Sequence, residues 1–218
     1  MKNYMKILLL FFAILMVPNK SEADYYSGGE VHWEKLAQDS FKITAKIYHN
    51  CKYNSLKRFE LEIQSLTCFQ SQRIYLKRGN SHDITPVCAG ECSKCTSWGC
   101  GFKFGFEYEE FVGFINTSAF RKKGCCEARL SIEGCCRNGD TTSSRNGYFF
   151  NESILNLCIK GDNSSPKFAN HPNFFACEQQ DYISNLGAYD LDKDSITNKL
   201  SDSLVYSLTP PKTHLSGN

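Results

Sequence analysis

Long apolar runs are scarce in this sequence of 218 residues, and their scarcity excludes a chain built from membrane-spanning helices. The longest run, residues 7–17, has eleven residues, whereas a helix that spans a bilayer needs about 20. Two lysines precede the run and a small-x-small pattern follows it and ends at Ala23, which is typical of a signal peptide. We therefore expect residues 1–23 to be removed during export, a mature chain that begins at Asp24, and no transmembrane segment in that mature chain.

An excess of charge of one sign is also missing. The sequence has 25 Lys and Arg against 23 Asp and Glu, a formal net charge of +2, which argues against a nucleic-acid partner held by bulk electrostatics. The G-x-S-x-G motif of serine hydrolases is absent, and the five histidines show no metal-binding spacing such as H-x3-H. We expect a protein that is not an enzyme and that does not bind nucleic acid.

Sustained helical periodicity is absent as well, whereas alternation with a period of two recurs along the chain. In the first alternating segment Phe41, Ile43 and Ala45 are separated by polar side chains. Gly, Asn and Ser lie between the segments, as expected for short strands joined by turns. Many short strands of this kind form a sandwich or a barrel, so the pattern predicts an all-β, antiparallel, β-sandwich-like domain. The alternating segments are residues 41–48, 59–64, 73–77, 102–108 and 126–132.

The first two alternating segments are predicted to form a hairpin, because the polar residues 49–57 between them resemble a long loop. In the register of such a hairpin Cys51 lies in the turn, whereas Cys68 lies at the opposite end, near residue 39. These two cysteines are therefore not expected to pair. The third segment, residues 73–77, is expected to end at Gly79 and the polar residues after it.

Cysteine is abundant, with twelve residues, all of them after the leader. In an exported chain the oxidising surroundings favour disulfides over metal thiolates. We therefore expect a secreted or cell-surface protein in which most or all of the cysteines are disulfide-bonded. The candidates are Cys51, Cys68, Cys88, Cys92, Cys95, Cys100, Cys125, Cys126, Cys135, Cys136, Cys158 and Cys177.

Two groups of cysteines allow a more specific interpretation. The doublets Cys125-Cys126 and Cys135-Cys136 bracket one predicted strand, and neighbouring residues of a strand point to opposite faces. Each doublet can therefore join the strand to two neighbouring elements. The C-x3-C-x2-C-x4-C spacing of residues 88–100 offers four thiolates for zinc, but it is compressed relative to a zinc ribbon, so disulfides are favoured there too.

Composition divides the mature chain into two parts. Eleven of the twelve cysteines precede residue 160, and residues 161–166 are mostly small and polar and end in proline, which is typical of a linker. We predict a cysteine-rich β domain over residues 24–160 and a partial β domain over residues 161–218. The second part supplies only two or three of the strands that a sandwich needs, so we expect it to pack poorly or to lean on the first domain.

Several motifs share their order and spacing with one bacterial family. They are GGEVHWE at residues 28–34, the strand and cysteine at 41–51, the doublets and CCRN at 125–138, NSSPKF at 163–168, Cys177, AYDLD at 188–192, and DSLVYSL at 202–208. Together they resemble the N-terminal region of large gliding-motility-associated surface proteins, which commonly continue into PKD-like or cadherin-like β-sandwiches and are exported by type IX secretion. The resemblance implies a cell-surface adhesion protein, with other surface proteins or glycans as partners and a cadherin- or PKD-like sandwich beginning at residue 161. It implies no catalytic residue.

Asp190, Asp192 and Asp194 are the best candidate metal ligands. Carboxylates at alternate positions suit a hard cation such as calcium. The segment is not an EF-hand, because Ser195 stands where that loop needs Gly. We predict weak calcium binding at most, and we expect no other cofactor.

The leading hypothesis from the sequence is an exported, disulfide-stapled, non-enzymatic surface or adhesion module that forms the N-terminal part of a larger cell-surface protein. A secreted carbohydrate-binding protein is the alternative, and it would use a period-two aromatic stripe that is otherwise a buried sheet face: Phe102, Phe104, Phe106 and Tyr108. A secreted glycoside hydrolase is the third hypothesis, and it would use a pair of the carboxylates Glu107, Glu109 and Glu110.

Overall fold

The structure is a computed structural model that describes residues 26–51, 58–87, 91–96, 105–135, 137, 148–158, 161–173, 181, 183, 185–190 and 192. The predicted signal peptide, residues 1–23, lies outside this part of the chain. Strands dominate the described residues, beside one short helix, α2 (Ser118–Lys122). The all-β class predicted from the sequence is therefore confirmed. No helix in these ranges is long and apolar enough to cross a membrane.

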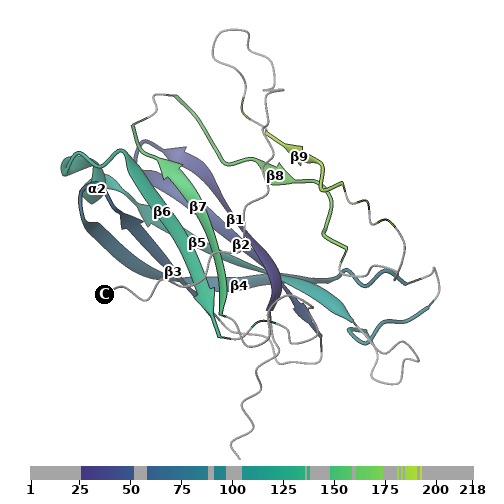
Figure 1. The fold of residues 1–218 in the computed structure, drawn as a ribbon. Coiled ribbons are helices and arrows are strands. Elements are labelled where there is room, and N and C mark those ends of the chain that lie inside the picture. Colours follow the sequence, from purple (N-terminus) through teal and green to yellow (C-terminus); the bar gives the residue numbers. More distant parts are fainter. Residues whose placement is uncertain are drawn as a thin grey trace, which may run out of the picture.

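Seven strands form one antiparallel sheet in the order β1-β2-β5-β4-β3-β6-β7 (Figure 1). The sheet curls until its two edge strands approach each other, so the fold is nearly a barrel. The strands are β1 (Tyr26–Ala37), β2 (Ser40–Asn50), β3 (Arg58–Ser65), β4 (Gln70–Asp83), β5 (Phe106–Asn116), β6 (Glu127–Gly134) and β7 (Phe149–Asn156).

Side-chain hydrogen bonds join the two edge strands, β1 and β7. The Trp33 indole N–H donates to the carbonyl of Ile154 at 3.2 Å, and the Asn151 amide donates to the carbonyl of Gly29 at 2.7 Å. A Cβ atom at Gly29 would lie 2.6 Å from the ring of Phe149, so the absence of a side chain allows the strands to come this close. These contacts between β1 and β7 cover sheet edges that would otherwise expose unpaired backbone groups.

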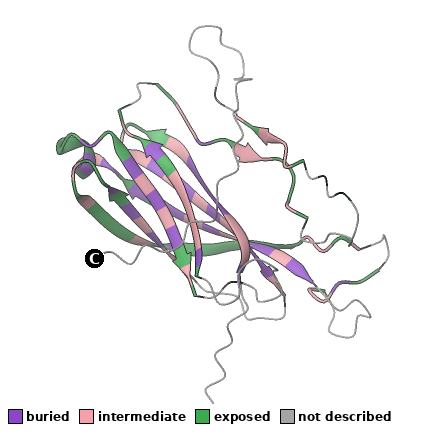
Figure 2. Cartoon of the chain, viewed as in Figure 1, coloured by how far each residue is buried: buried purple, intermediate pink, exposed green. Residues whose placement is uncertain are grey.

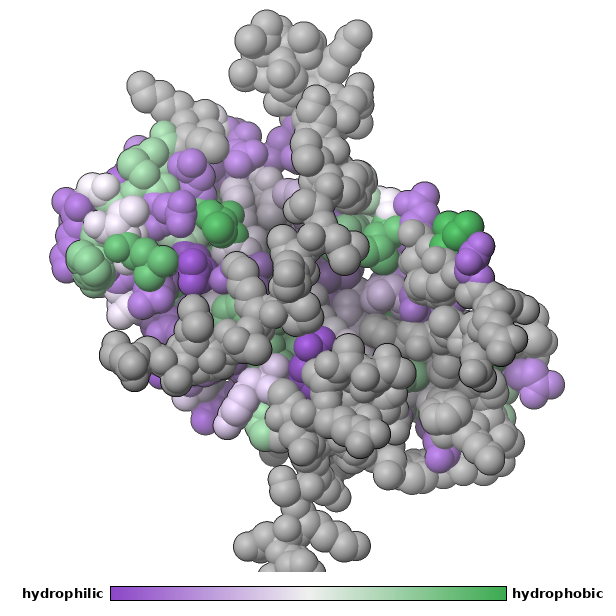
Figure 3. Space-filling view, viewed as in Figure 1, coloured by the Kyte–Doolittle hydropathy of each residue, from purple (hydrophilic) through white to green (hydrophobic). Residues whose placement is uncertain are grey.

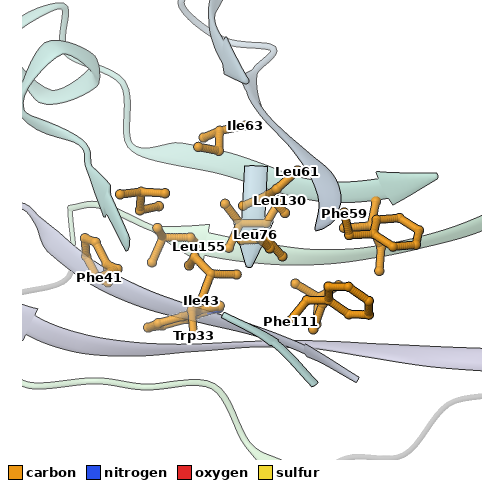
Figure 4. Close-up of a cluster of buried hydrophobic side chains, with 14 of the residues drawn as sticks. Trp33, Phe41, Ile43, Phe59, Leu61, Ile63, Leu76, Phe111, Leu130 and Leu155 are labelled. Atoms are coloured by element: carbon orange, nitrogen blue, oxygen red, sulfur yellow. The ribbon is translucent and has the colours of Figure 1, made fainter. Parts of the chain in front are cut away.

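The hydrophobic core fills the inside of the curled sheet, because inward-facing side chains alternate along each strand. In β2, Phe41, Ile43 and Ala45 are buried and the residues between them are half-buried, as the alternation predicts. Figure 2 shows this alternation of buried and less buried residues along the strands. Side chains from several strands meet in one cluster in Figure 4, among them Trp33, Phe41, Ile43, Phe59, Leu61, Ile63, Leu76, Phe111, Leu130 and Leu155.

The predicted hairpin between residues 41–48 and 59–64 is wrong. Strand β2 pairs with β1 and β5, and β3 pairs with β4 and β6, so these two strands are not neighbours in the sheet. Alternation shows which face of a strand is buried, but it carries no information about which strand lies beside it. Sequence proximity was a poor guide here because β5 occupies the edge of β2 that the hairpin would have used.

Strand β4 continues past the position where the sequence predicted its end. It runs through Gly79 to Asp83, and its pairing with β5 shifts register between Arg78 and Ser81. The glycine therefore lies in a bulge within the strand, which is the other common role of glycine in a strand.

Three disulfides join elements that are distant in sequence: Cys51–Cys95, Cys68–Cys125 and Cys126–Cys158. The side chain of Cys125 is buried and that of Cys126 is exposed, so the doublet bonds in two directions, as predicted from strand geometry. Cys125 joins β6 to the turn between β3 and β4, and Cys126 joins it to the end of β7. Cys51 and Cys68 do not pair with each other, as the sequence predicted.

Among the described residues of the segment 88–100, Cys92 and Cys95 are disulfide-bonded, which favours the disulfide interpretation of this segment over a site of four zinc thiolates. Cys135 is disulfide-bonded as well. The expectation of disulfides thus holds for all eight of the candidate cysteines that lie among the described residues. Cys88, Cys100, Cys136 and Cys177 lie outside them.

Residues 161–173, here called the strap, pack along β1, which is an edge strand of the sheet. The Ser165 N–H donates to the carbonyl of Trp33 at 2.9 Å, and the Ser165 hydroxyl accepts from the N–H of Trp33 at 2.8 Å. Beyond this contact, β8 (Lys167–Phe168) pairs with β9 (Ala188–Tyr189). The strap therefore leans on the barrel, whereas the predicted partial domain over residues 161–218 stays a prediction. Residues 193–218 lie outside the described ranges, so the cadherin-like sandwich stays a prediction.

Candidate functional site

The strap and the ends of β4 and β5 form a surface cavity of about 570 Å³. Aromatic rings and hydrogen-bonding groups line it together, which is the usual composition of a small-ligand site. The lining residues are His82, Asp83, Ile84, Thr85, Pro86, Phe106, Tyr108, His171, Pro172 and Asn173.

The ring of Tyr108 forms part of the cavity wall. It stacks on the ring of His82 with centroids 4.9 Å apart, and it lies 4.7 Å from the ring of His171. Lys46 Nζ lies 5.6 Å from the centroid of the same ring, within the range of a cation–π contact. Burial and then the charge of Lys46 lower the pKa of His171. Its ring is therefore neutral at neutral pH and can both donate and accept a hydrogen bond.

Glu30, His32 and Tyr48 form a buried hydrogen-bonded chain beneath the strap. His32 Nε2 lies 2.6 Å from the carboxylate of Glu30, and His32 Nδ1 donates to the carbonyl of Pro166 at 3.0 Å. The Tyr48 hydroxyl donates to the second oxygen of Glu30. Burial alone would raise the pKa of Glu30, but the hydrogen bonds from His32 and Tyr48 outweigh it, so this pKa is lowered. The chain fixes the strap, and with it one wall of the cavity, to β1 and β2.

Replacing Glu30 by Gln is expected to lower the free energy of unfolding by about 1–3 kcal/mol at neutral pH, because a buried, charged hydrogen-bond acceptor is lost. The pKa of Glu30 is lower in the folded chain than its ordinary 4.5. Its contribution is therefore complete above that value and is lost as the pH falls through the lower folded pKa. Urea unfolding of both proteins at neutral and acid pH should show the difference narrowing in acid. The exposed Glu127→Gln variant should unfold with the same free energy as the unaltered chain. A loss of stability in Glu30→Gln that does not change with pH would contradict the role assigned to the Glu30 carboxylate.

The inward faces of β2 and β5 carry a second polar cluster at the same end of the barrel. His49 Nε2 lies 3.7 Å from a carboxylate oxygen of Glu107 and 3.7 Å from one of Glu109. Arg78 lies 2.8 Å from the other oxygen of Glu109. Burial and the neighbouring charge of Glu109 raise the pKa of Glu107 against the attraction of His49. His49 and Glu109 are almost completely buried, at 0% and 1% exposed.

A disulfide and a side-chain network hold this end of the barrel in place. Cys51, which directly follows β2, is bonded to Cys95, and its N–H donates to the carbonyl of Gly105 at 3.0 Å. Asp83, at the end of β4, accepts from the hydroxyl of Thr85 at 2.6 Å and also from the hydroxyl of Ser93. These hydrogen bonds outweigh the effect of burial and lower the pKa of Asp83. The cavity wall and the cluster of His49, Glu107 and Glu109 therefore lie at an end of the barrel that is held by a disulfide and by side-chain hydrogen bonds.

The structure places the aromatic stripe differently from a carbohydrate-binding platform. Phe106 and Tyr108 are only 7% and 8% exposed, so they line the cavity without presenting open ring faces to solvent. Phe102 and Phe104 lie outside the described residues. The stripe thus contributes a cavity wall in the part of the chain that the structure describes.

The three candidate carboxylates do not form one group. Glu107 and Glu109 face His49 on the inside, whereas Glu110 lies at an alternate position of β5 and so faces outward. The acid–base pair proposed for a hydrolase is therefore reduced to two residues, of which Glu109 is buried and bonded to Arg78.

The predicted calcium ligands are described only in part. Asp192 accepts the N–H of Ser164, and Asp190 Oδ1 accepts the N–H of Asp192 at 3.0 Å. Burial raises the pKa of Asp192, the bond from Ser164 lowers it, and Asp190 raises it further, with a net increase. Asp194 lies outside the described residues, so calcium binding here stays a prediction.

Sequence reasoning did not identify the histidines that surround both sites. His82 and His171 have no spacing that connects them, because the strap brings them together only in the folded chain. The position of His49 could have been inferred from the sequence. It continues the inward-facing positions 41, 43, 45 and 47 of β2, so the alternation places its imidazole on the inner face at the end of the core.

Comparisons of this chain with protein-family models, with curated proteins and with solved structures find no match. The function of the site is therefore inferred from its geometry alone.

Proposed function

We propose that this chain is an exported, disulfide-stapled, non-enzymatic binding module of an adhesion-type surface protein, and that it holds its ligand in the cavity beside Tyr108. The observation that carries this proposal is the cavity itself, about 570 Å³ in volume and built on a cross-linked end of the barrel. A site that is fixed before the ligand arrives loses less entropy on binding.

Export and surface display rest on three features. The leader has the pattern of a signal peptide, the described cysteines are disulfide-bonded as in proteins of oxidising compartments, and the motifs resemble those of gliding-motility-associated surface proteins. These features support a role outside the cell, and the resemblance supports adhesion in particular.

The absence of a catalytic role is proposed from the placement of the carboxylates. A glycoside hydrolase needs two carboxylates that both reach the substrate. Glu109 is 1% exposed and Glu110 faces the other side of the sheet, so neither can act together with Glu107 on a bound sugar.

A surface cavity suits the proposed ligand site better than a flat apolar face does. Hydrophilic and hydrophobic residues are intermixed over the described part of the face shown in Figure 3. Phe69 and Phe114, which are 93% and 67% exposed, come from different elements, a turn and a strand. The cavity, in contrast, gathers aromatic, imidazole and carboxylate groups in one place.

Carbohydrate is the second candidate for the ligand. Sugars are bound by aromatic rings together with side chains that donate and accept hydrogen bonds. Tyr108 and Phe106 supply the rings, and His82, His171 and Asn173 supply polar groups in the same cavity. A peptide of another surface protein is the main alternative to a glycan.

Binding of the mature chain to a glycan array and to surfaces coated with candidate adhesion partners tests this proposal. We expect specific binding to at least one surface, and we expect His82→Ala and His171→Ala each to weaken it at least tenfold, because both exposed rings line the cavity. Phe114→Ala is the matched control: Phe114 is an exposed aromatic residue on the same outward face of β5, and it does not line the cavity. Binding that survives both histidine variants, or falls equally in the control, would place the ligand site elsewhere.

A further inference from the structure

We propose that His49, Glu107 and Glu109 bind a divalent transition-metal ion of the zinc type inside the end of the barrel. This site is distinct from the ligand cavity, because it lies on the inward face of β5 whereas Tyr108 lies on the outward face. It also differs from the predicted calcium site in both its residues and the metal that they suit.

The candidate ligand atoms lie close to one another, and each carboxylate is at a distance from His49 that a shared metal ion allows. One atom each from His49, Glu107 and Glu109 lie within 4.8 Å of one another, and His49 Nε2 is 3.7 Å from each carboxylate. Two ligands bonded to one zinc ion at about 2.0–2.2 Å lie about 3.3–3.7 Å apart at ordinary bond angles. In contrast, a direct hydrogen bond between imidazole and carboxylate would bring the atoms to about 2.7–3.2 Å.

The imidazole of His49 is oriented as a metal ligand. Its Nδ1 lies 3.2 Å from the carbonyl of Asn50, and a carbonyl can only accept, so Nδ1 carries the proton. In the neutral ring the lone pair of Nε2 is then directed toward the two carboxylates. Metal-bound histidines usually donate their second N–H to a carbonyl in this way.

The carboxylate of Glu109 is oriented in the same manner. Its Oε1 forms an ion pair with Arg78 at 2.8 Å, and its Oε2 is the oxygen that faces His49. Arg78 thus supports the ligand from outside, as a residue that positions a metal ligand does. Two carboxylates and an imidazole lone pair repel one another in a buried site, and a divalent cation removes this repulsion.

The donor set selects the class of metal. One imidazole nitrogen and two carboxylate oxygens suit zinc and its first-row neighbours, whereas calcium and magnesium prefer oxygen ligands throughout. Glu107 is more exposed than its two partners, with 19% of its side chain accessible, so solvent can reach the site from the side of this residue.

Zinc titration of the tag-free, fully oxidised, chelator-treated mature chain tests the proposal by calorimetry. We expect one zinc ion per chain, and we expect Glu107→Gln, Glu109→Gln and His49→Gln each to weaken binding at least tenfold. Glu110→Gln makes the same change of charge in the same strand on the opposite face, and it should bind zinc like the unaltered chain. His171→Gln should also bind normally, which separates this site from the histidines of the cavity.

A second measurement keeps the test decisive if a buried variant does not fold. The visible spectrum of the Co²⁺-loaded chain should show nitrogen and oxygen ligands without thiolate bands, and the spectrum should be lost in the more exposed Glu107→Gln variant. Absence of saturable binding at one ion per chain would overturn the proposal. Binding that persists in Glu107→Gln would overturn it as well.

Discussion

Replacing Cys68 and Cys125 together by alanine is expected to lower the free energy of unfolding by about 4 kcal/mol, the value that chain entropy assigns to a loop of this length. The bond closes a loop with a sequence separation of 57 and joins β6 to the turn between β3 and β4. Cys125 is fully buried and belongs to the core cluster, so its loss also removes packing. Urea unfolding of the variant and of the unaltered chain, both oxidised, measures the difference.

The pair Cys126 and Cys158 provides the comparison for this result. Its loop is shorter, with a sequence separation of 32, and Cys126 is exposed. Removal of this bond should therefore cost less than removal of Cys68–Cys125, although still about 2–4 kcal/mol. An equal or larger loss at Cys126–Cys158 would contradict the packing contribution assigned to Cys125.

Leu130→Ala is expected to lower the free energy of unfolding by about 2–5 kcal/mol, because it leaves a cavity inside the barrel. Leu130 is 0% exposed and lies in β6, between β3 and β7, where it belongs to the core cluster shown in Figure 4. The change can be measured by urea unfolding at neutral pH.

Ile154→Ala is the matched control for this core variant. Ile154 lies in the neighbouring strand β7, opposite Arg129 and one residue from the partner of Leu130, but its side chain is 51% exposed. Its carbonyl, which accepts from Trp33, is retained in the variant. We expect a change below about 1 kcal/mol, and similar losses at the two positions would show that Leu130 does not face a closed core.

Much of the fold could be predicted from the sequence, because alternation depends only on local geometry. Phe41, Ile43 and Leu61 lie in the core as their period-two pattern indicates, and the opposite directions of Cys125 and Cys126 follow from the same rule. The choice of neighbouring strands could not be predicted in this way. Pairing of β2 with β5 depends on contacts between residues that lie 56 to 76 positions apart, from Asn50 with Phe106 to Ser40 with Asn116, and no local pattern specifies them.

The candidate site was predictable to a lesser degree. Phe106, Tyr108, Glu107 and Glu109 were all noticed as residues of interest, but their roles depend on which face of β5 each occupies and on what packs there. The strap that brings His171 to Tyr108 is held by hydrogen bonds to β1, and the sequence contains no trace of that contact. The site is therefore a product of tertiary structure, as polar sites at the ends of strands commonly are.

The central claim is that disulfides between distant elements cross-link this near-barrel and support its site. Peptide mapping of the oxidised chain by mass spectrometry under non-reducing conditions tests it most directly. The account predicts linked peptides that contain Cys51 with Cys95, Cys68 with Cys125, and Cys126 with Cys158. Free thiols at these positions, or a bond between Cys51 and Cys68, would contradict it.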